Sequence, residues 1–189
     1  MTDGLKSSNA RERSQAVLAL GKSPDHAASV RAIEPLLRQD PDQHVRIDAT
    51  VALGQLGGAD ATALLVDKAV STDERIVRIA ALEAIETNRD PSAVPGVISV
   101  FRLDRGQDDV VAQIGASEAL LKIGAPAVPQ LVQALTDPSA KVRAAVVDVL
   151  GRMGNPEVAD KLTGLQADPD PGVRRAVEGA LATLKGAKH

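Results

Sequence analysis

The side chains that most often carry out chemistry in proteins are few and scattered in this chain. Histidine occurs at His26, His44 and His189, and none has a second histidine or a cysteine at the spacing of a metal-ligand pair. The chain has no cysteine, which excludes disulfides, thiolate metal sites and cysteine nucleophiles. No serine stands in a strand–turn–helix elbow, so nucleophilic catalysis has no candidate. The sequence therefore predicts no catalytic residue, no metal site and no cofactor.

Two further sequence patterns contain residue types that are common in catalytic or phosphate-binding sites. The acidic pairs Asp108 with Asp109 and Asp168 with Asp170 suit acid–base catalysis, but both stand where a helix is expected to begin. A carboxylate there offsets the helix dipole and the unpaired backbone N–H groups. The glycines of "LGQLGGAD" follow a helix rather than a strand, so they indicate a helix end and not a phosphate-binding loop. We interpret both patterns as structural.

Composition narrows the function classes further. Apolar residues make up 44% of the 189 residues but aromatic residues only 1%, and the net charge is −3. Nucleic-acid binding is disfavoured, because it typically needs a basic face and stacking aromatics. No apolar window is long enough to span a membrane, and the first residues do not resemble a secretion signal. We expect a cytoplasmic protein that binds neither nucleic acid nor membrane.

A repeated sequence frame organises the chain. The dipeptide Val-Arg recurs at Val45-Arg46, Val77-Arg78, Val142-Arg143 and Val173-Arg174, and aligned frames lie 30 to 35 residues apart. Within one frame, Val142, Val146, Val149, Leu150 and Met153 fall on one helical stripe. An Asp-Pro pair precedes three frames, where the aspartate is expected to cap the helix, and glycine ends them.

This period predicts a stack of helix pairs. We expect one domain over residues 1–189, which is an all-α, right-handed superhelix of about 11 helices. A capping helix over residues 8–22 precedes five repeats, at residues 25–57, 58–89, 90–124, 125–154 and 155–186.

These frames resemble the short bacterial type of HEAT repeat, also seen in phycobilisome lyase subunits, within the armadillo-type α-solenoids. The resemblance implies a structural ladder of ion pairs between repeats, rather than an anion-binding site. Its expected members are Asp40, Arg46, Arg78, Asp137, Arg143, Asp168 and Arg174. The aligned position in the third pair is Gln113, which predicts a weaker seam there.

The resemblance also implies that the second helix of each pair lines a concave groove. Side chains off the apolar stripe should face this groove and bind a partner; they are Gln43, His44, Ile47, Asp48, Val51, Arg75, Ile76, Ile79, Glu83, Val110, Val111, Ile114, Glu118, Lys122, Lys141, Asp148 and Arg152. Seven of them are branched aliphatics, which favours an exposed apolar patch. The alternative is that curvature buries several between repeats, Ile76 and Val111 above all.

Without a catalytic candidate, function is expected to come from this surface. The leading hypothesis is a non-enzymatic scaffold or adaptor that binds a peptide or helix of a protein partner in the groove. One alternative is a phycobilin lyase-type subunit that acts on a chromophore-binding protein. A nucleic-acid repair module and a regulatory domain of a larger protein are further alternatives. The sequence leaves the partner's identity and the oligomeric state open.

Overall fold

A computed structural model describes residues 3–104 and 106–186, and their secondary structure is entirely helical. The α-helices in this part of the chain are α1 (Ala10–Leu20), α2 (His26–Gln39), α3 (Gln43–Leu56), α4 (Ala59–Val70), α5 (Arg75–Asn88), α6 (Val94–Val100), α7 (Gln107–Ile123), α8 (Val128–Ala134), α9 (Ala140–Met153), α10 (Ala159–Thr163) and α11 (Pro171–Gly186). The prediction of an all-α superhelix of about 11 helices is confirmed.

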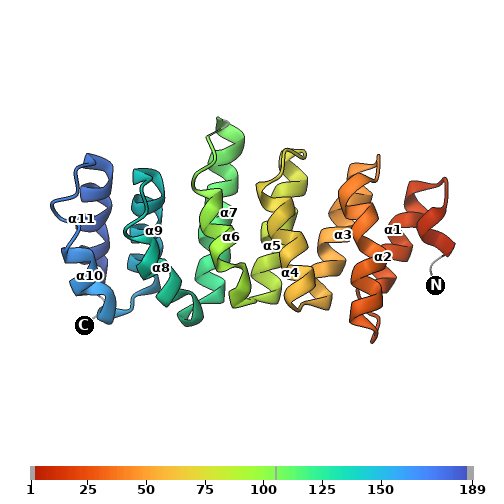
Figure 1. Cartoon of the computed structure of the whole chain (residues 1–189), viewed down its shortest axis with the longest axis horizontal. Coiled ribbons are helices and arrows are strands. Elements are labelled where there is room, and N and C mark those ends of the chain that lie inside the picture. Colours follow the sequence, from red (N-terminus) through yellow and green to blue (C-terminus); the bar gives the residue numbers. More distant parts are fainter. Residues whose placement is uncertain (1–2, 105, 187–189) are drawn as a thin grey trace.

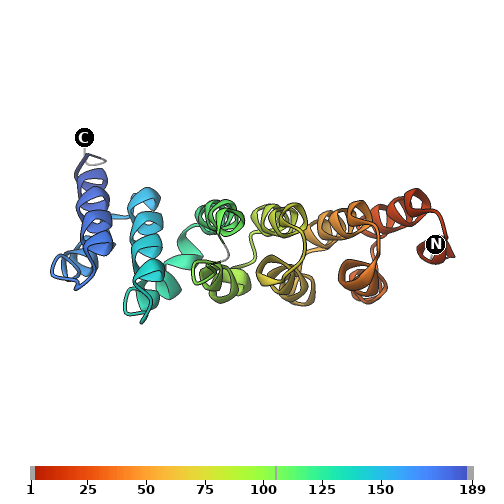
Figure 2. The ribbon, with the colours of Figure 1, turned by 90° about the horizontal axis from the view of Figure 1, so that it is seen from above.

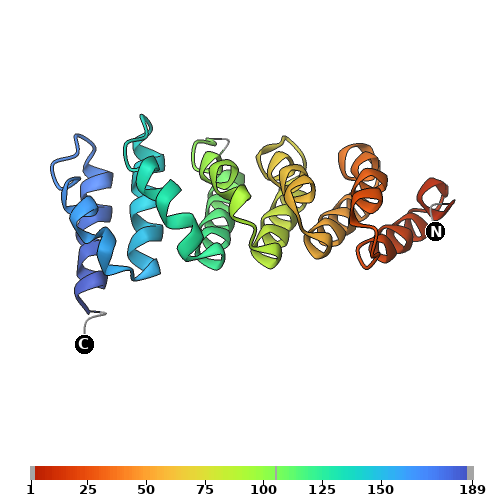
Figure 3. The ribbon, with the colours of Figure 1, turned by 60° about the horizontal axis from the view of Figure 1, so that its bottom comes forward.

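The helices form a row of hairpins that stand side by side (Figures 1 and 3). The odd-numbered helices make one layer, here called the inner layer, and the even-numbered helices from α2 to α10 make the outer layer (Figure 2). The helix axes turn along the row: α5 and α7 are seen nearly end-on in Figure 2, whereas α9 and α11 lie in the plane of the page. Each inner helix packs against the next, so residues about 30 apart in sequence become neighbours.

Prolines shape the outer layer. Short 3₁₀ turns at Pro91–Ala93, Ala125–Ala127 and Pro156–Val158 lead into α6, α8 and α10. Proline is favoured in a first helical turn, because its missing N–H has no intrahelical partner there. The outer helices of the last three pairs are therefore shorter than the inner helices beside them.

The core is aliphatic and runs through the whole row. Val142, Val146, Val149 and Leu150 are fully buried, as the helical stripe in the sequence requires. The corresponding faces of the other inner helices are buried in the same continuous cluster. Small side chains suit this arrangement, because they let neighbouring helices approach closely.

Glycine sets the closest approach between inner helices. Nine residues after the frame valine stand Gly54 in α3 and Gly151 in α9. A Cβ atom added to Gly54 would lie 2.9 Å from the Cβ of Ala84, and one added to Gly151 would lie 2.6 Å from the Cβ of Ala180. The same position in α7 holds Leu121, and α7 and α9 pack less extensively than other inner-layer neighbours.

This sparse packing falls at the seam where Gln113 interrupts the arginine frame. The Gln113 side chain donates to the Leu103 carbonyl at 3.0 Å instead of reaching the next pair. Arg102, at the end of the outer helix, pairs with Asp137 in its place. Lys141 adds a second bridge to Asp104 at 2.7 Å, although both side chains are largely exposed. Exposed pairs contribute little, about 0–1 kcal/mol each, so a weaker seam here stays a prediction.

Candidate functional site

Arginine–carboxylate pairs join successive repeats and hold the inner layer in register. Arg13 binds both carboxylate oxygens of Asp40 at 2.7 Å, and Arg143 binds both of Asp168 at 2.8 Å. In both pairs the arginine belongs to the preceding unit. These hydrogen bonds lower the pKa of Asp40 and of Asp168, against a smaller opposing effect of burial. Bidentate contacts of this kind fix orientation as well as distance.

Three of the ladder arginines also bind the turn before their own helix. Arg46, Arg143 and Arg174 donate to the backbone carbonyls of Asp40, Asp137 and Asp168, each six residues earlier, at 2.6, 2.8 and 2.7 Å. This is why the sequence places Asp-Pro at a fixed distance before Val-Arg. Arg174 donates to the Pro169 carbonyl as well, at 3.1 Å.

The middle of the ladder uses carboxylates that the sequence analysis did not single out as ladder members. Arg46 pairs with Asp73, at 3.2 Å, and with Glu74. Arg78 pairs with Asp109 at 2.9 Å, and both side chains are almost completely buried. Arg46 and Asp73 are 27 residues apart, as are Arg13 and Asp40, so this spacing could have indicated Asp73. Arg78 and Asp109 are 31 residues apart, so the same spacing does not indicate Asp109.

The expected role of the Asp-Pro aspartates as helix caps needs correction. The caps of α3 and α11 come from Asp42 and Asp170, whose side chains accept hydrogen bonds from the backbone N–H groups of His44 and Gly172 at 2.8 and 2.7 Å. Asp168 instead accepts from the Asp170 backbone N–H, at 2.9 Å, and from arginine. One aspartate binds the arginine of the preceding repeat, and the aspartate two residues later caps the helix.

None of the side chains expected in the groove is buried. Half-buried are Ile47, Asp48, Ile79 and Glu118; exposed are Gln43, His44, Val51, Arg75, Ile76, Glu83, Val110, Val111, Ile114, Lys122, Lys141, Asp148 and Arg152. Ile76 is 54% exposed and Val111 38%, so the alternative that these two are buried between repeats is wrong.

An apolar strip crosses three neighbouring inner helices. We define it as Ile47 and Val51 on α3, Ile76 and Ile79 on α5, and Val110, Val111 and Ile114 on α7. Its most exposed members are Ile114 and Ile76, at 59% and 54%. The large apolar side chains that are exposed in the described residues all belong to this strip. A contiguous apolar surface of this kind is typical of a binding site.

Carboxylates flank the strip on the side toward the helix C-termini. We call Glu83 and Glu86 on α5 and Glu118 on α7 the acidic row. Burial raises the pKa of Glu86, and the nearby carboxylates of Glu118 and Glu83 raise it further, while Lys122 acts in the opposite direction. Glu118 accepts a hydrogen bond from Arg152 at 2.6 Å. The acidic row therefore carries more negative charge than its cations neutralise.

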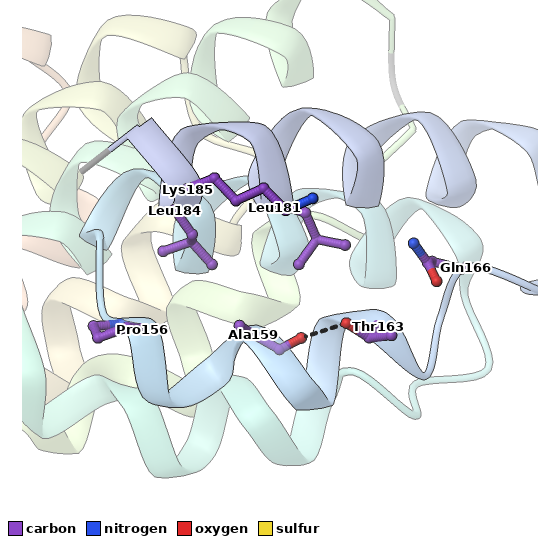
Figure 4. Close-up of a pocket in the computed structure, with 7 residues that line it drawn as sticks. All are labelled: Pro156, Ala159, Thr163, Gln166, Leu181, Leu184 and Lys185. Carbon is purple, nitrogen blue, oxygen red and sulfur yellow. Dashed lines mark hydrogen bonds between the residues drawn. The ribbon is translucent and has the colours of Figure 1, made fainter. Parts of the chain in front are cut away.

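Cavities lie elsewhere on the structure. One of about 300 Å³ lies between α9 and α11 and includes Arg152, Arg175, Gly179 and Thr183 in its lining. Another, of about 340 Å³, lies between α10 and α11, where Leu181, Leu184 and Lys185 face Pro156, Ala159 and Thr163 (Figure 4). Counterparts of Leu181 in earlier repeats, such as Leu53 and Leu150, are fully buried.

No group of three or more metal-ligating side chains comes together in residues 3–104 and 106–186. Within the same ranges, no helix combines the length and the apolar character needed to span a bilayer. His26 and His44 are exposed and far apart in sequence, whereas His189 and the side chain of Asp108 lie outside the described residues.

The stacked hairpins, the shared aliphatic core and the ladder between repeats define an α-solenoid of helical repeats. The chain belongs to the HEAT-repeat family, whose sequence pattern matches residues 1–86 and 95–182. The resemblance seen in the repeated frames is thereby confirmed.

Two of the known proteins that are similar to this chain bear on its function. One is the phycocyanobilin lyase subunit beta of Nostoc sp. strain PCC 7120, which is 33% identical over 114 residues, covering 60% of this chain and 54% of the relative. The chain thus spans about half the length of this curated relative. The other is the structure of the complex of CpcE and CpcF of phycocyanin lyase from the same strain. It aligns with a TM-score of 0.56 and 26% identity, over 97% of this chain and 75% of the matched chain.

These relatives correct our leading hypothesis. We expected a non-enzymatic scaffold and no enzyme, because the chain has no catalytic candidate. Both relatives are subunits of a lyase, which contradicts that hypothesis and favours the alternative of a lyase-type subunit. An enzyme built from several subunits can distribute its functions among them, so a chain without catalytic groups of its own can still be an enzyme subunit.

Proposed function

We propose that this chain is a subunit of a phycobilin lyase, an enzyme that acts on a chromophore-binding protein. The similarity to the CpcE–CpcF structure carries this proposal, because it extends over 97% of the chain. The shorter match to a phycocyanobilin lyase subunit points in the same direction. By this proposal the substrates are a bilin such as phycocyanobilin and an apo-protein such as phycocyanin, and the reaction takes place in the cytoplasm.

The geometry suits a subunit that holds and orients a protein substrate. The ion-pair ladder and the close helix contacts make the row rigid, and the apolar strip offers a surface on which a protein can dock. The chain has no cysteine, so it has no thiol with which to hold a bilin covalently itself. We propose that a second subunit completes the enzyme, since the similar structure is a complex of two proteins.

A reconstitution assay tests the proposal. Phycocyanobilin and apo-phycocyanin are incubated with the chain alone, with CpcE or CpcF alone, and with the chain plus either of these subunits. Absorption spectra report bilin binding, and bilin fluorescence on a denaturing gel reports covalent attachment. The complete CpcE–CpcF pair serves as the positive control.

Attachment by the chain plus one subunit, above the level of that subunit alone, supports the proposal. If the control pair attaches bilin while every mixture with this chain shows neither a spectral shift nor an adduct above background, the proposal is wrong.

A further inference from the structure

The apolar strip crosses the helices at matched positions. Ile47, Ile79 and Ile114 each stand two residues after the first frame position of α3, α5 and α7. Because the three helices pack side by side (Figure 1), these matched positions form a line that runs along the row and across the helix axes. Ile76 and Val111 widen this line on one edge, and both are exposed.

The spacing of the line fits an α-helix. Packed helices lie about 8–10 Å apart, and two turns of an α-helix advance about 10.8 Å. Apolar residues at i, i+7 and i+14 of a bound helix would therefore meet three successive inner helices. In a β-strand, side chains on one face repeat about every 6.6 Å and would lose this register. The strip thus favours a helix over an extended segment.

Charge gives the bound helix a second requirement. The acidic row of Glu83, Glu86 and Glu118 flanks the strip on one edge, and Asp48 lies on the same side on α3. Arg152 already bonds Glu118, and Lys122 lies near Glu86. The opposite edge has Gln43, His44 and Arg75, and its carboxylates already have partners, since Asp42 caps α3 and both Asp73 and Glu74 pair with Arg46. A ligand with cations along one flank complements this asymmetry, because opposite charges fix orientation at a partly desolvated surface.

We propose that the apolar strip binds one amphipathic helix of a partner protein, with apolar residues seven apart and lysine or arginine along the flank that faces the acidic row. This inference rests on the proposed function only in taking that partner to be the chromophore-binding protein. The bound helix would lie across α3, α5 and α7 and roughly parallel to the long axis of the row.

A pair of model peptides tests the docking directly. Each is a labelled helix of roughly 18 residues, long enough to cross three helices, with leucine at every seventh position. One has lysines along a flank, and its counterpart has glutamates at the same positions. Fluorescence anisotropy with the whole chain measures both dissociation constants. The lysine peptide should bind at least about tenfold more tightly, and added salt should reduce this difference.

Matched variants locate the binding surface. Ile114→Asp should raise the dissociation constant of the lysine peptide by about tenfold or more, because it places a charge within the strip. Ala63→Asp is the control, since Ala63 is also exposed but lies on the outer helix α4. Glu83→Lys should reduce the preference for the lysine peptide over the glutamate peptide. It should leave unchanged the part of the binding free energy that the leucines contribute. Circular dichroism of each variant shows that it is folded.

Equal binding of the two peptides, or undiminished binding to Ile114→Asp, would overturn the inference. A wild-type dimer in sedimentation experiments that Ile114→Asp dissociates would also overturn it, since a second copy would then occupy the strip. The peptide assay contains no bilin. Peptide binding without bilin attachment therefore counts against the proposed function alone, and attachment without peptide binding counts against this inference alone.

Discussion

Replacing Gly151 with alanine tests the close contact between α9 and α11. The added Cβ atom would lie 2.6 Å from the Cβ and 2.8 Å from the Cα of Ala180 on α11. Carbon atoms in favourable contact lie about 3.5–4.0 Å apart, so the two helices must separate locally by about 1 Å. Gly179, which is also helical, has nothing within 4 Å of an added Cβ and gives a matched control.

The two substitutions should change stability in opposite directions. Alanine is better than glycine inside a helix by about 0.8–1.0 kcal/mol, and this gain applies at both positions. Overpacking costs about 1–3 kcal/mol and applies only at Gly151. Gly179→Ala should therefore stabilise the protein by somewhat less than about 1 kcal/mol, since its surroundings are open. Gly151→Ala should be less stable than Gly179→Ala by about 1–3 kcal/mol.

Urea unfolding followed by circular dichroism measures the difference, because the chain has no Trp or Tyr to serve as a fluorescent probe. Adding Ala180→Gly to the Gly151→Ala variant should recover part of the loss, since it removes the clashing Cβ atom, and a double-mutant cycle quantifies that coupling. If Gly151→Ala is as stable as Gly179→Ala, the close approach of α9 and α11 is wrong.

Three further predictions concern the charged groups. Arg78→Met should lower the free energy of unfolding by about 3–5 kcal/mol in chemical denaturation, because it takes the guanidinium away from the buried Asp109 carboxylate; a loss below about 1 kcal/mol would contradict the buried pair. The pKa of Asp168 is lowered in the folded state by its hydrogen bonds from Arg143. The stabilisation that Asp168 provides is therefore complete above the ordinary aspartate pKa of about 3.9 and is lost as the pH falls through the lower folded value. Urea midpoints measured down to acid pH should show this loss, and Arg143→Met should make the midpoint depend less on pH. The pKa of Glu86 is raised by burial and by its acidic neighbours, so Glu86→Gln should stabilise the protein by about 0.5 kcal/mol at neutral pH, and the gain should vanish at pH values where Glu86 is protonated.

Parts of the candidate site could be predicted from local patterns, and parts could not. The strip followed from offsets within single helices, which place Ile76 and Ile114 on the face opposite to the buried stripe. Glu86 was missed, because its offset, nine residues after the frame valine, belongs neither to the buried stripe nor to the positions expected in the groove. No sequence pattern pointed to Arg102, since it stands outside the repeated frame. It pairs with Asp137, which lies in the loop between α8 and α9.

The function could not be derived from residue chemistry alone. Sequence patterns showed the absence of catalytic groups, and from that absence we inferred a non-enzymatic protein. Similarity to lyase subunits corrected the inference, because an enzyme subunit can act by binding and orienting a substrate without carrying a reactive side chain.

The sequence by itself determined the repeat, its period, the helical stripe and the absence of cysteine chemistry, because all of these are local or compositional properties of the chain. Only the tertiary structure decided which carboxylate each arginine meets, as with Arg78 and Asp109, and which aliphatic side chains remain exposed. Those outcomes depend on how one hairpin is set against the next. Helix spacing, loop length and the absence of a side chain at positions such as Gly151 fix that arrangement together. Their combined effect cannot be read from a single repeat.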